Sequence, residues 1–191
     1  MKNIVDVIKE LLVPDILGKI ILDNTIGQYY AQLKEDSTDS KLREICILEV
    51  PEDSILIKLD KYKQPQTLVK NKLGQRQRCD YVLLTSYMEQ RLMLFIEPKS
   101  VWPKYEDIVK QFKGSECVMD YCNAFLNRFH AQDNLFEHFQ KRFVVFYYNS
   151  GKKQNTRPQG PSLKNDIPRE AYKYPLSQGD ASVPLKNLVK L

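Results

Sequence analysis

The sequence lacks the features that identify membrane-spanning and secreted proteins. None of its segments contains 18 consecutive apolar residues, the length that a membrane-spanning helix requires. Acids and lysines interrupt the apolar pattern of the amino-terminal segment MKNIVDVIKELLVPDILGKIIL. A secretory signal needs an uninterrupted apolar stretch followed by a small-residue cleavage site. We therefore expect a cytoplasmic protein that has no membrane partner.

Clusters of cysteine and histidine that could hold a metal are also missing. The four cysteines form no CxxC pair, and the two histidines, His130 and His138, lie eight residues apart. A structural zinc site built from these residue types is therefore not expected. The apolar residues that flank Cys46 and Cys79 instead predict reduced thiols packed within strands.

The composition is that of an ordinary globular domain with an uneven distribution of charge. Hydrophobic residues make up 42% and charged residues 28% of the 191 residues, and the net charge is +5. Residues 141–191 carry ten Lys or Arg and three acids, a net charge of +7, so residues 1–140 sum to −2. A basic segment attached to a nearly neutral core suits a polyanionic partner, although a solvated tail that keeps the protein soluble would have the same composition.

Apolar spacing in the first third of the chain predicts helices followed by strands. Residues 3–33 carry apolar side chains at helical spacing, and Pro14 predicts a division into two helices because proline removes a donor and clashes with the preceding turn. Beyond a polar loop at 34–40, the Ile- and Leu-rich runs at 44–50 and 54–60 flank a turn and predict a β-hairpin. Residues 61–78 are polar and basic and predict a loop.

The rest of the chain alternates between strand and helix patterns. Strands are expected at 79–85 and 91–97, a helix at 104–129 and a buried strand at 142–148. The apolar line of that helix consists of Ile108, Phe112, Met119, Cys122, Leu126 and Phe129. A helix between two strands is the crossover unit of a parallel strand pair.

These patterns predict an α/β fold with a mixed central sheet flanked by helices. Residues 1–40 form an amino-terminal helical segment that packs on the core, and residues 41–148 form the core itself. Residues 149–191 form a basic, loop-rich carboxyl-terminal extension, in which a short strand and a terminal apolar contact are expected within 171–191.

Three charged residues lie at the ends of two neighbouring strands. Asp80 opens the strand at 79–85, and Glu97 and Lys99 stand two residues apart at the end of the strand at 91–97. Residues i and i+2 of a strand share a face, and a hairpin would place Asp80 beside them. Two adjacent carboxylates repel each other unless a cation lies between them, and such ligands suit Mg²⁺. With a lysine to stabilise developing charge, the set suits the hydrolysis of phosphodiesters.

This acid–acid–lysine arrangement resembles the PD-(D/E)xK nuclease superfamily, which has the restriction-endonuclease-like fold. The resemblance rests on Asp80 in CDYVLL, on Glu97 and Lys99 in LFIEPKS and on the helix that follows, and it covers roughly residues 44–148. It implies an α-β-β-β-α-β core and Mg²⁺- or Mn²⁺-dependent cleavage of nucleic acid, usually DNA. Some members carry a glutamine on that helix, which Gln111 would match here.

The sequence departs from the family pattern in two places. Cys79 stands where the family usually has a proline, and Pro98 lies inside the E-x-K motif, where its missing donor requires a strand end or a bulge that could redirect Lys99. Many members also carry a further acid on the first core helix. The candidates for that acid are Glu10, Asp15, Asp23 and Glu44.

Two groups of basic residues are candidates for contacts with phosphates. One group precedes Asp80 in the chain and the other follows the strand at 142–148. The first consists of Lys72, Arg76 and Arg78, and the second of Lys152, Lys153 and Arg157. The family resemblance implies a DNA endonuclease in genome defence or DNA processing. We expect it to act as a homodimer or with a partner protein such as an ATPase.

The same residues also allow a structural interpretation. Asp80 could accept hydrogen bonds from turn amides, and Glu97 could form an ion pair with Lys99 or Arg91. The protein would then be a catalytically inactive member of the fold that binds nucleic acid or a partner protein, or an interaction subunit whose tail docks on its partner. Pro98 favours this alternative, whereas the presence of all three acid–acid–lysine residues argues against it.

Overall fold

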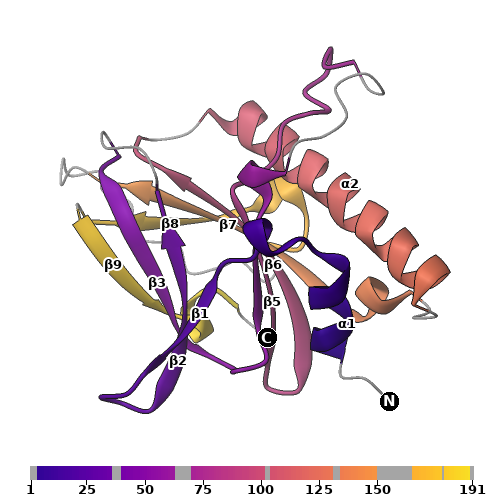
Figure 1. Ribbon diagram of the computed structural model, residues 1–191. Helices are drawn as coiled ribbons and strands as arrows, with labels where there is room; N and C mark the ends of the chain where they lie inside the picture. The colour runs from indigo at the N-terminus through magenta and orange to yellow at the C-terminus, as the bar shows by residue number, and fades with distance from the viewer. Residues whose placement is uncertain are drawn as a thin grey trace.

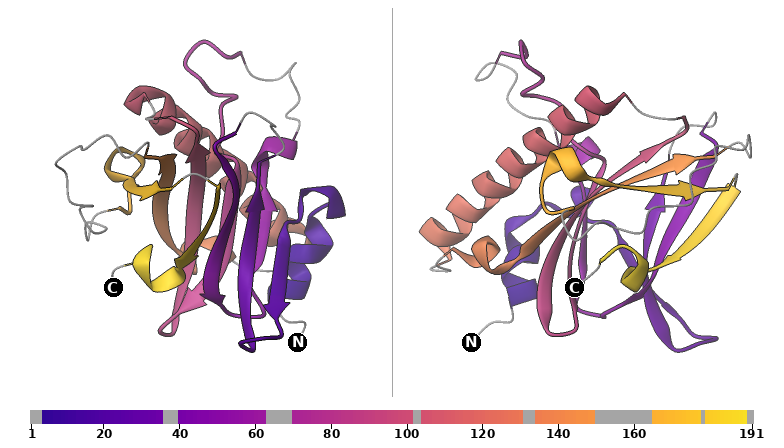
Figure 2. Two further views of the ribbon diagram at one scale, coloured as in Figure 1. Left: turned by 90° about the vertical axis from the view of Figure 1, so that its left-hand side faces the viewer. Right: turned by 180° about the vertical axis from the view of Figure 1, so that it is seen from behind.

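Two β-sheets and two α-helices stack in three layers in the fold of the described residues (Figure 1). The computed structural model describes residues 4–35, 40–62, 70–101, 104–130, 134–149, 165–177 and 179–189. Both helices lie on one side of a five-stranded sheet and a four-stranded sheet lies on the other, as Figure 2 shows from two further sides. The predicted α/β class is confirmed, but the prediction of a sheet flanked by helices holds for one face alone, because the four-stranded sheet covers the other face. Within these residues no helix has the length and apolarity that a membrane crossing requires.

The five-stranded sheet is mixed and contains the strands on which Asp80, Glu97 and Lys99 were predicted to lie. Its order is β4 (Ile55–Lys58), β5 (Tyr81–Tyr87), β6 (Gln90–Lys99), β7 (Gln140–Tyr148) and β8 (Tyr172–Leu176). The first three strands pair antiparallel and the last three pair parallel. Helix α2 (Tyr105–Phe129) links β6 to β7. The predicted hairpin, helix and parallel crossover are therefore confirmed.

Alternation along the buried strands of this sheet divides the hydrophobic core in two. On β6, Leu94 faces the four-stranded sheet, whereas Phe95 faces α2 and α1 (Ile4–Leu11). Phe95 stacks on Phe143 of β7 with ring centroids 4.9 Å apart, and Phe112 of α2 meets Phe143 edge to face. The same alternation continues to the end of β6 and turns Glu97 toward the helices.

The four-stranded sheet corrects the prediction of a second amino-terminal helix. Its order is β1 (Lys19–Asp23), β2 (Gln28–Lys34), β3 (Leu42–Val50) and β9 (Gly179–Pro184). After a single 3₁₀ turn at Pro14–Ile16, the chain forms the β1–β2 hairpin, whose turn contains Gly27 at φ +66°. The helical prediction was wrong because the apolar positions also fit a period of two, with Ala31 and Leu33 buried on one face.

The predicted hairpin between residues 44–50 and 54–60 was half right. Both runs are strands, but β3 pairs with β2 and β9, whereas β4 pairs with β5. The turn at 51–54 carries the chain from one sheet to the other. Just before this turn, the register between β2 and β3 shifts, and the backbone of Glu49 has a positive φ. Apolar runs specify strands here without specifying their partners.

The end of helix α2 and the carboxyl-terminal segment both differ from their predictions. Phe129, the last position of the predicted apolar line, is 73% exposed, because the helix runs beyond its last buried residue, Leu126. The end of the chain contributes more than loops, since β8 joins the five-stranded sheet and β9 the four-stranded sheet. Leu185 and Leu188 then complete the core between the sheets, as the predicted terminal contact requires.

Candidate active site

The β5–β6 hairpin determines the positions of the three residues singled out in the sequence. Its two-residue turn, Met88 and Glu89, has positive φ at both positions, the backbone of a tight turn that matches strand twist. The resulting register pairs Tyr81 with Ile96 at the far end of the hairpin. Asp80 therefore lies immediately before β5 and opposite the end of β6, beside the acid of the E-x-K motif.

Glu97 is the centre of the hydrogen-bond network at this end of the hairpin. Its side chain is fully buried. The backbone N–H of Asp80 donates to Oε2 at 3.0 Å, and Nε2 of Gln111 donates to Oε1 at 2.8 Å. Lys99 Nζ forms an ion pair with the same Oε1. A buried carboxylate requires such partners, so the predicted set of Asp80, Glu97, Lys99 and Gln111 meets at one point.

Burial and mutual electrostatic interactions shift the pKa values of Asp80, Glu97 and Lys99. Burial and the negative charge of Glu97 raise the pKa of Asp80 to about 8, while Lys99 opposes the shift. Burial likewise raises the pKa of Glu97 against the effect of Lys99. Burial acts to lower the pKa of Lys99, but the attraction of Glu97 and Asp80 outweighs it and the pKa is raised. The lysine is therefore protonated at neutral pH, whereas Asp80 of the metal-free protein keeps its proton up to about pH 8.

Pro98 does not redirect Lys99. Strand β6 continues through the proline, and Glu97, Pro98 and Lys99 pair in unbroken register with Val145, Phe146 and Tyr147 of β7. Pairing with β5 ends at Ile96, so the proline lies where β6 has a single neighbouring strand. The side chains on either side of it share the helix-facing side, as simple alternation predicts.

Two small residues of helix α2, which were not predicted as site residues, contact the segment that precedes Asp80. Ser115 is fully buried; its Oγ accepts a hydrogen bond from the backbone N–H of Cys79 at 2.8 Å and lies 2.9 Å from the carbonyl of Gln111. A Cβ on Gly114 would lie 1.8 Å from the carbonyl oxygen of Gln77. The segment before Asp80 therefore lies directly on the helix. Two small residues within a long helix are the sequence signal for this contact.

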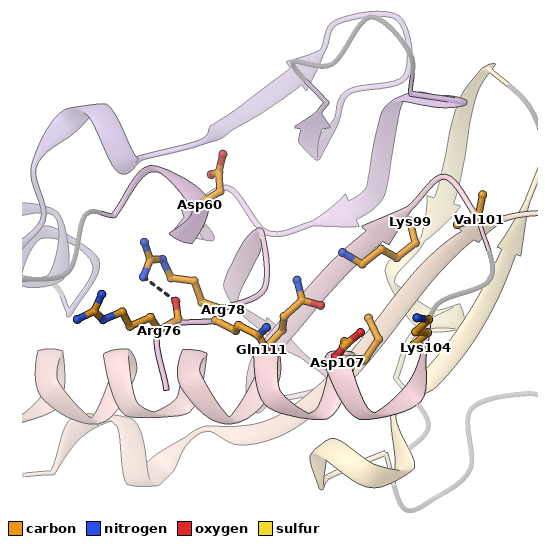
Figure 3. A pocket seen from close by; sticks show the side chains of 10 residues that line it. Asp60, Arg76, Arg78, Lys99, Val101, Lys104, Asp107 and Gln111 are labelled. Atoms are coloured by element: carbon orange, nitrogen blue, oxygen red, sulfur yellow. Dashed lines mark hydrogen bonds between the residues drawn. The ribbon is translucent and has the colours of Figure 1, made fainter. Parts of the chain in front are cut away.

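A cavity of about 620 Å³ opens over Lys99 and Gln111 (Figure 3). Figure 3 shows Lys99 reaching into it from the sheet, with Asp107 and Lys104 along the helix and Asp60 on the far side. Its lining contains four cationic side chains and two acidic ones. The cations are Arg76, Arg78, Lys99 and Lys104. The cavity is thus predominantly basic, and of the four clustered residues Lys99 and Gln111 line it.

The structure separates the residues predicted to contact phosphates into three groups. Arg76 lines the cavity, whereas Lys72 is exposed and does not line it. Arg78 also lines the cavity, but its guanidinium donates to the carbonyls of Leu59, Arg76 and Tyr62, so it organises the loop before Asp80. The other three, Lys152, Lys153 and Arg157, lie outside the described residues.

The acids that raise the pKa of Asp80 most are not the four candidates for a further acid. Glu44, for example, accepts a hydrogen bond from Gln32 and pairs with Lys34 on the four-stranded sheet. The acids that raise the pKa of Asp80, besides Glu97, are Glu35 and Asp60. Glu35 directly follows β2 and lies in the segment 34–40 that was predicted as a polar loop, so its position depends on a strand that was predicted as helix.

The donor set fits a hard divalent cation held largely by water and substrate. No group of three His, Cys, Asp or Glu side chains arranged to hold a metal occurs among the described residues. Mg²⁺ commonly takes one or two protein carboxylates and fills its remaining positions with water and phosphate oxygens. Asp80 and Glu97 supply such a pair, and a cation bound between them would favour the ionised form of Asp80 in place of its proton.

Comparison with known proteins places the chain in no family. No family model, no curated protein and no solved structure matches it. What this chain does is therefore inferred from the chemistry of its own residues.

Proposed function

We propose that this protein is a metal-dependent phosphodiesterase, a cytoplasmic nuclease with DNA as the expected substrate. The observation that carries the proposal is the convergence of Asp80, Glu97 and Lys99, with Glu97 fully buried and Lys99 lining a basic cavity. Holding a buried and a half-buried carboxyl group beside one lysine costs stability, and such costs are concentrated at functional sites. The cations of the cavity provide the complementary surface for a phosphate backbone.

Asp80 and Glu97 are the residues that would hold Mg²⁺ or Mn²⁺. The ion would polarise the phosphodiester and lower the pKa of a bound water. Gln111 fixes the orientation of the Glu97 carboxylate by donating to Oε1. The Lys99 ammonium, which is 32% exposed, faces the cavity from its ion pair with Glu97 and can stabilise charge on the phosphate oxygens. Arg76 and Lys104 can hold the flanking phosphates.

The restriction-endonuclease-like core is the finer description of the fold that we propose. The order of β4, β5, β6, α2 and β7, with the acids on the β5–β6 hairpin, agrees with what that resemblance implies. A homodimer or a partner such as an ATPase would provide the second active site or the specificity that duplex cleavage needs.

One observation favours a second candidate, an inactive member of the fold that binds nucleic acid or a partner protein. Lys99 forms a direct ion pair with Glu97, and a purely structural pair would have the same geometry. This candidate predicts binding to nucleic acid without cleavage.

Cleavage assays distinguish the two candidates. Purified protein would be incubated with plasmid, linear duplex, single-stranded DNA and RNA, in the presence of Mg²⁺, Mn²⁺ or EDTA. We expect metal-dependent cleavage that Asp80→Ala and Lys99→Ala abolish and that Lys186→Ala, which removes a surface lysine paired with Glu49, retains. Circular dichroism would check folding. Cleavage that survives both site substitutions would contradict the proposal, and binding without cleavage would favour the inactive alternative.

A further inference from the structure

The hydroxyl of Tyr81 ties the four-stranded sheet to the site. Tyr81 directly follows Asp80 and is only 4% exposed. Its Oη donates to the carbonyl of Lys34 at 2.5 Å and accepts from the N–H of the same residue at 3.0 Å. Lys34 is the last residue of β2. One side chain thus fixes the end of β2 against the start of β5, at the position of the first site carboxylate.

A second contact holds the other end of the connection between β2 and β3. Ser100, which directly follows Lys99, accepts a hydrogen bond from the N–H of Lys41 at 3.4 Å, and its Oγ lies 3.1 Å from Oγ of Ser40. Ser40 donates to the carbonyl of Leu42 at 2.9 Å, so Ser100 is the donor between the two hydroxyls. Both ends of the connection are therefore bound to residues that adjoin the site.

Glu35 is placed near the site by these contacts. It directly follows Lys34, and its N–H donates to the carbonyl of Arg43 at 3.1 Å, which extends the pairing of β2 with β3 by one residue. Alternation along the extended strand places Glu35 on the same face as Ala31 and Leu33, the face that is turned toward the five-stranded sheet. The direction of the pKa shifts of Asp80 and Lys99, to which Glu35 contributes, agrees with this placement. An acid from the four-stranded sheet therefore acts on a cluster built on the other sheet.

We propose that Glu35 is a further functional residue of this site, held beside Asp80 and Lys99 by the hydroxyls of Tyr81 and Ser100, and that its charge strengthens the binding of a divalent cation. The inference rests on the proposed function, because it concerns the same metal site. Glu35 increases the negative charge around a cation held by Asp80 and Glu97 without being one of its predicted ligands. Tyr81 and Ser100 are positioning residues, since they act through the backbone that carries Glu35.

Calorimetric titration of the full-length protein with Mn²⁺, without nucleic acid and at fixed ionic strength, tests this inference. We expect Glu35→Gln to weaken Mn²⁺ binding by roughly 3- to 10-fold, the effect of one nearby unit charge that is partly screened. Glu35→Asp, which keeps the charge, should restore most of the affinity. The matched control is Glu44→Gln, which removes an acid from β3 and should leave the affinity within about twofold.

The role of Tyr81 is tested by the same titration. Tyr81→Phe keeps the buried ring but removes both hydrogen bonds to Lys34, and it should weaken Mn²⁺ binding in the same direction as Glu35→Gln. The double variant should bind no more weakly than Glu35→Gln alone, because both changes act through one carboxylate. Losses that multiply in the double variant would overturn the positioning role.

The outcomes also separate this inference from the proposed function. Mn²⁺ binding that disappears in Asp80→Asn but is unchanged in Glu35→Gln would overturn the role of Glu35 and leave the proposed metal site intact. Wild-type protein that binds no Mn²⁺, or binds it equally well without Asp80, would overturn both. Thermal melts of each variant would confirm that the folded protein is being titrated, and Glu35→Gln alone decides the matter if Tyr81→Phe does not fold.

Discussion

The two ends of the β5–β6 hairpin differ in the polar groups that they bury. Near the turn, the hydroxyls of Thr85 and Ser54 are buried and lie 2.7 Å apart, a neutral pair that satisfies itself. At the far end, the carboxyl groups of Asp80 and Glu97 lie beside one lysine, and burial raises the pKa of both. One end of the hairpin therefore makes a neutral polar contact with the residue before β4, and the other end carries an ionisable cluster that burial makes costly, as expected of a functional site.

The largest expected effect comes from removing charge at the far end. Asp80→Asn keeps the size of the side chain but removes one of the two proposed ligands, so metal-dependent cleavage should fall by about 1,000-fold or more. The rate under single-turnover conditions at saturating Mg²⁺ would measure the loss. A loss smaller than about tenfold would mean that the two ends of the hairpin do not differ in function as proposed.

A smaller loss is expected from Gln111→Ala. The change removes the donor that orients the Glu97 carboxylate but leaves Lys99 on the same oxygen, so cleavage should fall by roughly 10- to 30-fold. The same cleavage assay would measure it. Lys113→Ala, two residues further along the exposed side of α2, is the matched control and should retain activity. Equal losses in the two variants would remove Gln111 from the site.

The turn end should show the opposite behaviour. Thr85→Val leaves the Ser54 hydroxyl buried without its partner and should lower the free energy of unfolding by about 1 to 2 kcal/mol, while cleavage stays unchanged. Urea denaturation would measure the change in stability. Adding Ser54→Ala should recover much of the loss, because both polar partners are then absent. A strong loss of cleavage in Thr85→Val would contradict the proposal that only the far end of the hairpin takes part in cleavage.

The smallest effect concerns the pH dependence of the metal-free protein. The pKa of Asp80 is raised from 3.8 to about 8 in the folded state, so the folded protein holds this proton more tightly than the unfolded chain. The contribution of Asp80 to stability is therefore greatest below pH 4 and declines as the pH rises toward 8.

Denaturation of wild type and Asp80→Asn in EDTA at pH 5 and pH 8 tests this sign. We expect the variant to gain stability relative to wild type at pH 8, on the order of 1 kcal/mol because partial access to solvent screens the carboxylate. A relative loss of stability in Asp80→Asn at pH 8 would show that the ionised carboxylate is stabilised by its surroundings.

Periodicity was sufficient to predict the region that contains the site and insufficient for the rest of the fold. Strands β5, β6 and β7 and helix α2 have long apolar patterns of one clear period. The connection between β5 and β6 is short enough to require a hairpin, which places Asp80 beside Glu97. The β1–β2 hairpin was missed because its apolar spacing fits both helix and strand. The partners of β3 and β4 depend on packing between sheets that pattern does not encode.

The site was likewise predicted only where its residues lie close in the chain or on one well-defined helix. Asp80, Glu97, Lys99 and Gln111 meet as expected. Glu35 directly follows a strand of the other sheet, so only the three-dimensional arrangement of the two sheets brings it near them. A residue such as Glu35, which is distant in the sequence from the other site residues, belongs to no motif whose spacing could identify it.

Single-turnover cleavage by wild type, Asp80→Asn and Thr85→Val, compared side by side with Mg²⁺ and with EDTA, tests the central claim most directly. The substrate would be the nucleic acid that the wild-type protein cleaves in the assay above. If the wild-type protein cleaves none of them, plasmid DNA would be used. The account predicts metal-dependent cleavage by wild type and Thr85→Val and its loss in Asp80→Asn. Cleavage by Asp80→Asn at the wild-type rate, or no metal-dependent cleavage by any of the three proteins, would contradict it.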